Sequence, residues 1–470
     1  MHDWEEMNFK NQATEKYLYY FLFLHILLWT AIPSAFNTNL HLDTIEALAW
    51  GNELQWGYDK WPPMFPIFTE FFFKLFGNQD WAYYFLSQLF VATTFLIIFK
   101  FSTSFFKDKI FALISVMLLE GIYFFNYTTP ELNAFVCEFP FLAATVHFCW
   151  KAINKNDYLN WFLFALFAGF SFLTYYLSLY LLAGIGLFFL NDIIKTKTIN
   201  FKYFLTVIIF LLIISPHVYW LYQNEFKSVG YAIFRSINDP LSGINEFKII
   251  DHLIYPLIFL IKQISILTPF FIILIFAVSS FKIKINFKDR KLIFLFAVAI
   301  LPIALMFLTS LIGGIRIRTM WMTTFYLFPG IFFLYLLKKN IKIKKLKNFF
   351  IIFSIFFFLS PILYGADSYF KKSKRTDFPG KKIALIVQNK WNENFSDSIE
   401  IVIGEGWLYG GWYAGNLSYH LESRPKLKYK VDGEINIGSI YVEPLNNKKK
   451  CSGTVLNLEP YFEICMIGRK

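Results

Sequence analysis

Acidic and basic side chains that could do chemistry gather in the polar segments between long apolar runs. Asp43 and Glu46 lie in the first such segment, and Glu131 lies in the second. The cations of the corresponding segments are Lys60, Arg235, Arg316 and Arg318. A positioned carboxylate can take a proton from a hydroxyl or an amine, and Arg or Lys can hold a phosphate. Together these residue types suit the displacement of a phosphate leaving group carried on a lipid.

Several common catalytic motifs are absent from the sequence. It contains no P-loop, no HExxH, no CxxC and no GxSxG. The lack of a P-loop argues against an ATP-driven pump. The carboxylates and cations named above are therefore the best candidates for a reactive site.

The elements that must position these residues are membrane-spanning helices. Of the 470 residues, 56% are hydrophobic and only 17% are charged, and the mean hydropathy is +0.46. A soluble protein carries about 25% charged residues. Repeated apolar runs of about 20 residues indicate spans, so we predict a polytopic membrane protein whose first span is retained. The abundance of Phe, Ile, Lys and Asn is typical of an AT-rich bacterial genome.

Basic clusters between the apolar runs predict the orientation of the spans. Clusters such as 282–291 and 338–347 mark cytoplasmic loops by the positive-inside rule, which explains the net charge of +12 without nucleic acid. We predict a cytoplasmic N-terminus and spans at 17–36, 82–101, 109–126, 133–150, 158–172, 173–190, 203–222, 252–280, 291–312, 319–337 and 348–366. The segments on the outer, periplasmic face of a bacterial inner membrane are then 37–81, 127–132, 223–251, 313–318 and the tail.

The longest outer segment, 37–81, contains a predicted helix with carboxylates on one face. Asp43, Glu46, Trp50 and Glu53 are spaced i, i+3, i+7 and i+10, which places them on the same helix face. This helix is too polar to span. We expect it to lie along the membrane-water boundary, where tryptophan is favoured, and to end before a Pro-Pro pair.

The charged residues of the outer segments also have purely structural interpretations. Asp43 followed three residues later by Glu46 resembles a capping box, so Asp43 could simply cap the helix. Arg316 and Arg318 could anchor a helix end by reaching the lipid headgroups, and Lys60 could be a solvated loop charge. These interpretations stay open at the level of the sequence.

The tail, 369–470, differs in composition from residues 1–368, and we predict that it forms a separate soluble α/β domain. Two β-rich runs, KKIALIV (381–387) and IEIVIGE (399–405), are interpreted as strands, and a basic linker, 371–375, attaches this domain. Cys451 and Cys465 could pair if the domain is extracytoplasmic. The aromatic run 407–413 could stack on sugar rings or fill the core of the domain.

The first outer segment resembles part of a known family. LDTIEALAWGNELQWGYDKWPPMF (42–65) is similar to the first outer loop of bacterial GT-C glycosyltransferases. This group includes the protein O-mannosyltransferase-like family 39 and the lipid A aminoarabinose and galacturonic acid transferases. Asp43 stands at the position of the leading Asp, with W-G-Y and P-P in register. LLEGIYFFNYTTPELN, SPHVYWLYQNEF and GIRIRTMW resemble later signatures in the same order, so the resemblance covers most of residues 15–340.

The resemblance implies a GT-C fold of about eleven spans and a sugar donor linked through a monophosphate to a polyprenol. It implies that Asp43 is the base on the acceptor, with Glu131 and Glu46 as further acids of the site. Donor phosphate contacts are expected from Lys60, Arg235, Arg316 and Arg318, and substrate contacts from Trp50, Trp56, Tyr58, His217 and Trp321. No cofactor is required, because the cations can neutralise the phosphate. A Mg²⁺ or Mn²⁺ ion on Asp43 and Glu131 is the alternative.

The chain departs from the family pattern at four positions. Thr44 stands where many members have Glu, and Glu46 where the aminoarabinose transferases have Arg. Trp61 takes the place of a Lys before the Pro pair, with Lys60 one residue earlier, and Tyr175 replaces a Lys of a later helix. These changes bear on the donor sugar and the phosphate contacts, and not on the reaction class.

We therefore expect an inverting transferase that works on the periplasmic face, with lipid A, another glycan, a protein or a lipid as acceptor. The alternatives are a non-catalytic flippase or transporter of lipid-linked sugars and a structural assembly subunit. A carrier needs ionisable residues deep within its spans, and Glu120 and Glu138 are the main such residues here. Because the carboxylates gather outside the spans, the sequence favours surface chemistry.

Overall fold

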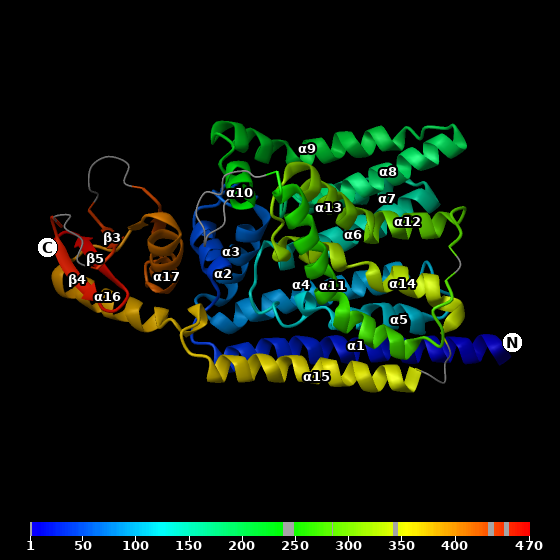
Figure 1. Cartoon of the computed structure of the whole chain (residues 1–470). Helices are drawn as coiled ribbons and strands as arrows, with labels where there is room; N and C mark the ends of the chain where they lie inside the picture. Colours follow the sequence, from blue (N-terminus) through cyan, green and yellow to red (C-terminus); the bar gives the residue numbers. More distant parts are fainter. Residues whose placement is uncertain (1, 238–248, 284, 342–345, 431–436, 446–450) are drawn as a thin grey trace.

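The structure, a computed structural model, describes residues 2–237, 249–283, 285–341, 346–430, 437–445 and 451–470. Parts of the predicted outer segment 223–251 and of the basic clusters 282–291 and 338–347 lie outside the described residues. Long helices run side by side through most of the molecule, and a small domain with a sheet lies at one end of them (Figure 1).

Within the described residues, seven single helices are long and apolar enough to cross a membrane. They are α1 (His2–Phe36), α4 (Asp80–Ser102), α6 (Ala134–Lys155), α8 (Ser178–Thr196), α9 (Lys202–Gln223), α11 (Asp251–Ala277) and α15 (Leu346–Phe370). Two bent pairs also qualify: α12 (Arg290–Ala299) with α13 (Leu301–Gly313), and η3 (Thr319–Tyr326) with α14 (Pro329–Leu337) and η4 (Lys338–Asn340). The chain is a multi-pass membrane protein.

The eleven predicted spans all fall on helices, but two of these helices are short. α7 (Tyr158–Phe172) has 15 residues, and α5 (Lys109–Met117) has 9 before it continues into η1 (Leu118–Gly121) and η2 (Tyr123–Phe125). A helix of 15 residues is about 22 Å long, which is less than a hydrocarbon core of about 30 Å. By length and composition, the described residues thus hold up to nine spans.

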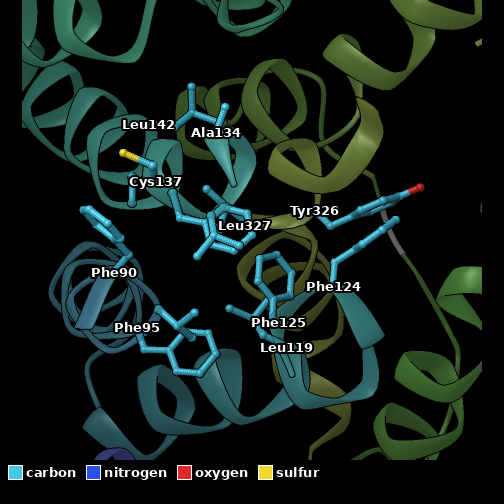
Figure 2. Packing of buried hydrophobic residues seen from close by; sticks show 14 of the residues in the cluster. Phe90, Phe95, Leu119, Phe124, Phe125, Ala134, Cys137, Leu142, Tyr326 and Leu327 are labelled. Atoms are coloured by element: carbon cyan, nitrogen blue, oxygen red, sulfur yellow. The ribbon is translucent and has the colours of Figure 1, made fainter. Parts of the chain in front are cut away.

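Helices α4 and α6 form the centre of the helical part. In their most apolar stretches, 72% and 78% of the residues are buried, against 22% for α9 and 33% for α11 and α15. Side chains of α4, η1 and α6 meet in this core, among them Phe95, Leu119 and Cys137 (Figure 2). The outer helices keep large apolar side chains exposed, such as Leu212 and Ile261, as expected of surfaces that face lipid.

The C-terminal part is built on a five-stranded sheet. Its elements are η6 (Arg375–Asp377), α16 (Gly380–Asn394), β1 (Ile401–Gly404), η7 (Gly406–Ala414), α17 (Gly415–His420), β2 (Lys426–Lys428), β3 (Ser439–Glu443), β4 (Thr454–Leu458) and β5 (Phe462–Ile467). The strand order is β2-β1-β3-β5-β4, in which β1 is parallel to both of its neighbours and β5 is antiparallel to both of its own. The predicted pairing of Cys451 with Cys465 is confirmed, because a disulfide joins them.

One of the two strands predicted for this domain is wrong. The run KKIALIV belongs to α16, whose buried residues Ile383, Ala384, Val387 and Trp391 recur at helical spacing. They form the face that packs on α17. Ile and Val favour strands locally, but burial of a single helix face decides the structure here. The other predicted strand, IEIVIGE, contains β1.

The C-terminal part packs on two short helices, α2 (Leu42–Gly51) and α3 (Met64–Phe76), which lie between it and the spans (Figure 1). Arg424 pairs with Glu70 of α3 at 2.6 Å, and its guanidinium lies 3.4 Å from the ring centre of Phe73. Residues 44–51 of α2 are all buried. Helix α2 is therefore covered by protein. The expectation that it lies along the membrane-water boundary stays a prediction.

Candidate active site

Helix α2 begins at Leu42 and carries Asp43 in its first turn. The N-cap residue is His41, so the capping role considered for Asp43 is wrong. Asp43 is partly exposed, whereas Glu46, one turn later, is fully buried. Glu53 lies beyond the end of the helix. The predicted acidic face therefore holds one partly exposed carboxylate and one fully enclosed by protein.

Glu131, from the second outer segment, lies near Asp43. Thr44 donates a hydrogen bond from Oγ1 to the carbonyl oxygen of Leu132 at 2.8 Å, which ties this segment to α2. Burial, and after it the charge of Glu131, raises the pKa of Asp43 to about 6. Burial also raises the pKa of Glu131. The two partly exposed carboxylates thus interact, and both hold a proton more readily than a free carboxylate does.

Lys60 forms an ion pair with Glu46, and its side chain is 14% exposed. The ammonium lies 6.0 Å from the ring centre of Trp50 and 5.7 Å from that of Tyr231. Burial lowers the pKa of Lys60, but Glu46 and Tyr231 outweigh it and hold the pKa above its ordinary value. Burial raises the pKa of Glu46 to about 7, against the opposing charge of Lys60. Lys60 is thus a cation held in place by protein, and the interpretation as a solvated loop charge is wrong.

A row of cations continues from Lys60 along Tyr231 of α10 (Lys227–Ile237). The guanidinium of Arg235 lies 5.9 Å from the centre of the same ring. Arg318 donates from Nε to the carbonyl oxygen of Arg235 at 3.1 Å. Lys60 and Arg235 are among the charges that oppose the burial-driven rise of the Asp43 pKa. Arg316 lies two residues before Arg318, and its side chain is exposed.

Arg375 of η6 is a further cation near the carboxylates, and sequence reasoning had placed it only in a linker. Its charge opposes the effect of burial on the pKa of Asp43, Glu46 and Glu131. Its guanidinium lies 5.3 Å from the ring centre of Trp407, which is 54% exposed. The basic run 371–375 was interpreted as a linker to the C-terminal domain, and its sequence distance from α2 concealed this proximity.

Two of the aromatic residues predicted to bind substrate pack inside the protein. Trp50 and Tyr58 stack with ring centres 5.5 Å apart and are 7% and 5% exposed. Trp50 donates from Nε1 to the hydroxyl of Tyr429 at 3.1 Å. These contacts attach α2 and the loop 52–61 to the C-terminal part, so both rings have a structural role.

His217 of α9 is fully buried and holds the same loop from the other end. Its Nδ1 lies 2.5 Å from the carbonyl oxygen of Trp56 and donates to it, because a carbonyl can only accept. Nε2 then accepts from the Tyr176 hydroxyl at 2.8 Å. The indole of Trp56 is 53% exposed and Trp321 is partly buried, so these two rings can contact a ligand.

Within the described ranges, no group of three or more His, Cys, Asp or Glu side chains comes together in a way that could hold a metal ion. The acidic pair at α2 offers two carboxylates. The local cations, Lys60 and Arg235, provide positive charge beside that pair.

Comparison with known proteins relates part of the chain to a family. Residues 60–220 match the family described as dolichyl-phosphate-mannose-protein mannosyltransferase, which confirms the family resemblance. No curated protein matches the chain. Among solved structures, ArnT from Cupriavidus metallidurans bound to undecaprenyl phosphate is 12% identical, with a TM-score of 0.48 over 86% of this chain and 85% of that one. The archaeal oligosaccharyltransferase AglB from Archaeoglobus fulgidus, in complex with an inhibitory peptide and a dolichol-phosphate, is 11% identical, with a TM-score of 0.43 over 86% and 64%.

Proposed function

We propose that this chain, a GT-C membrane glycosyltransferase of the protein mannosyltransferase-like kind, moves a sugar from a polyprenyl-phosphate donor to a hydroxyl of an envelope acceptor. The observation that supports this most is the partly exposed pair Asp43 and Glu131 beside the cations Lys60 and Arg235. A base next to a phosphate site is what an inverting displacement at a sugar phosphate needs.

Asp43 acts as the general base in this proposal. It takes the proton of the acceptor hydroxyl, the acceptor oxygen forms a bond to C1 of the sugar, and the bond from C1 to the phosphate oxygen breaks. Polyprenyl phosphate leaves with the electron pair, and the sugar inverts at C1. A pKa of about 6 leaves most of Asp43 ionised at neutral pH while keeping it more basic than a free carboxylate. Glu131 orients the acceptor or the sugar.

The cations stabilise the leaving phosphate. Lys60 is oriented by Glu46 and retains donors for a phosphate oxygen, because an ammonium has three. Arg235 and Arg318 are linked through the Arg235 carbonyl oxygen and can add guanidinium donors to the same group. Arg316, exposed on the same segment as Arg318, is the fourth of the proposed phosphate contacts.

We place the reaction on the periplasmic face of a bacterial inner membrane. The disulfide between Cys451 and Cys465 supports this placement, because disulfides persist in oxidising compartments. The C-terminal part that contains it packs directly on α2, so the disulfide and the carboxylates lie on one side of the membrane. Lipid A, another glycan, a protein and a lipid are the candidate acceptors.

The test is the envelope composition of cells that lack the protein or produce an Asp43→Asn variant. Loss of one defined glycose mass from lipids or glycans in both strains supports the proposal and names the product. Asp59→Asn is the matched control, because Asp59 is an exposed carboxylate of the same loop. Removal of a general base costs about 10²- to 10⁴-fold in rate. Full transfer by an Asp43→Asn protein made at normal levels refutes the role of Asp43.

The carrier alternative draws support from one buried pair. His25 Nδ1 of α1 lies 2.7 Å from Glu120 Oε1 of η1, and both side chains are almost fully enclosed. Asn126 donates to Glu120 Oε2 at 3.2 Å. Ionisable residues inside membrane helices mark transport pathways in many carriers. Transport of a lipid-linked sugar that survives Asp43→Asn but fails in His25→Phe would favour the carrier.

A further inference from the structure

Helix α10, which follows α9 in the chain, has two different faces (Figure 1). Ser228, Tyr231 and Arg235 are spaced i, i+3 and i+7, so they share one face. The opposite face holds three apolar side chains that are each more than half exposed: Ile233, Phe234 and Ile237. Among the described residues of α10, Ser228 is the one that is buried. This serine is therefore the main enclosed contact of the helix.

Three hydrogen bonds connect Ser228 to the loop 52–61. The Ser228 hydroxyl lies 2.6 Å from the Tyr176 hydroxyl, which belongs to the turn between α7 and α8. The same Tyr176 hydroxyl lies 2.8 Å from Nε2 of His217 in α9. His217 Nδ1 in turn lies 2.5 Å from the carbonyl oxygen of Trp56. A continuous chain of hydrogen bonds thus joins α10 to this loop.

The carbonyl oxygen at one end fixes the direction of every bond in the chain. A carbonyl can only accept, so His217 Nδ1 donates, and Nε2 of the neutral ring accepts. Tyr176 then donates its single hydroxyl proton to Nε2, and its oxygen accepts from Ser228. His217 and Ser228 are both fully buried. Loss of one bond would therefore leave a buried polar atom unpaired, which costs free energy.

The two segments that this chain joins carry the two cations of the proposed phosphate site. Lys60 lies in the loop 52–61, and Arg235 shares one face of α10 with Ser228. The ring centre of Tyr231 lies 5.7 Å from the Lys60 ammonium and 5.9 Å from the Arg235 guanidinium. Both distances are within the range of about 6 Å for a cation–π contact. The position of α10 therefore determines whether both cations can reach one ligand.

We propose that Ser228, Tyr176 and His217 are positioning residues that hold Arg235 beside Lys60, so that both cations bind one phosphate of the lipid-linked donor. This inference rests on the proposed function, because it identifies what assembles the phosphate site of that reaction. The three residues act through the cations and not by contact with the donor. Without the chain, Arg235 would be in place for only part of the time, and the apparent affinity for the phosphate would fall by that fraction.

The test measures the binding of polyprenyl phosphate to the full chain in nanodiscs, with phosphate-free polyprenol as the control ligand. We expect Ser228→Ala to weaken the binding of polyprenyl phosphate about fivefold, which is the effect of one lost hydrogen bond. Tyr176→Phe keeps the ring but cuts the chain at two bonds, and should weaken binding at least as much. Tyr180→Phe is the matched control, because its hydroxyl lies 2.8 Å from that of Thr309, outside the chain. This variant should bind as the wild type does.

A double-variant cycle separates positioning from a general structural role. In an Arg235→Gln background, Ser228→Ala should weaken binding by less than about twofold, because the cation that it positions is gone. The proposal is wrong if Ser228→Ala binds polyprenyl phosphate as tightly as the wild type, or if it weakens binding by the same factor in both backgrounds. A wild type that does not prefer polyprenyl phosphate to polyprenol would instead reject the phosphate site itself, and this inference with it.

Discussion

Replacing Arg375 by Gln should shift the acid limb of the pH–activity profile to higher pH. Arg375 lies outside the predicted motif, yet its positive charge counteracts the rise that burial and Glu131 impose on the Asp43 pKa. Without this charge, the pKa of Asp43 rises further. A general base works only when it is deprotonated, so the variant loses activity as the pH falls, and loses it earlier than the wild type does.

The size of the effect follows from the pKa of about 6. At that value about 90% of Asp43 is ionised at pH 7 and about 50% at pH 6. One neighbouring charge shifts a carboxyl pKa by on the order of one unit. With that shift, about 50% is ionised at pH 7 and about 10% at pH 6. The variant should therefore be about twofold slower at pH 7, about fivefold slower at pH 6 and equal to the wild type above about pH 8.5.

The assay is kcat/KM for sugar transfer by the full chain in nanodiscs between pH 5 and 9, because this quantity reports the pKa values of the free enzyme. Arg375→Lys keeps the charge and is the control, which should retain the wild-type profile. A pH-independent ratio between Arg375→Gln and the wild type would show that Arg375 acts by contact rather than by charge. An acid limb that moves to lower pH would refute the electrostatic reasoning.

Three further changes test other parts of the structure. Arg424→Met leaves Glu70 buried without its partner and should lower the free energy of unfolding by about 3 kcal/mol. The double variant with Glu70→Leu should recover much of this lost stability, as measured by thermal unfolding. A double variant that recovers no stability would contradict the pairing. The cysteines of the Cys451–Cys465 disulfide are 14 residues apart, and reduction of this bond should lower the stability of the C-terminal part by about 3 kcal/mol. An unfolding midpoint in denaturant that does not change when reductant is added would contradict the presence of this bond. Lys60→Gln should raise KM for the lipid-linked donor, whereas Lys60→Arg should retain most of the affinity. Equal KM values for the wild type and Lys60→Gln in steady-state kinetics would show that Lys60 does not contact the phosphate.

Much of the fold could be predicted from the apolar periodicity and the order of the motifs. The predicted spans fell on helices because runs such as 82–101 are apolar over the length that a bilayer requires. Two segments became short helices, since apolar residues continue through the breaks after Met117 and Phe172. The run 381–387 was interpreted as a strand because local β propensity says nothing about which face a neighbouring helix will cover.

The site was accessible to sequence reasoning only where its residues lie near α2. Asp43, Glu46 and Lys60 come from one segment and meet, as their spacing suggested. Arg375 and Tyr429 come from the C-terminal part, more than three hundred residues later in the chain, and reach the site through tertiary packing. Trp50 and His217 have residue types that suit substrate binding, but their hydrogen bonds to Tyr429 and Trp56 show that they hold the loop.

The packing of the C-terminal part on α2 determines when during biosynthesis this helix becomes covered. A Cβ at Gly411 would collide with the Glu46 carboxylate, and Trp50 bonds to Tyr429. The enclosure of α2 is thus built from residues that leave the ribosome after the described membrane helices. On the proposed topology, those residues must also cross the membrane and fold before α2 is covered. On the proposed function, a nascent chain would therefore pass through synthesis with an incomplete site, and transfer would begin only once residues such as Gly411 and Tyr429 had crossed the membrane and packed on α2.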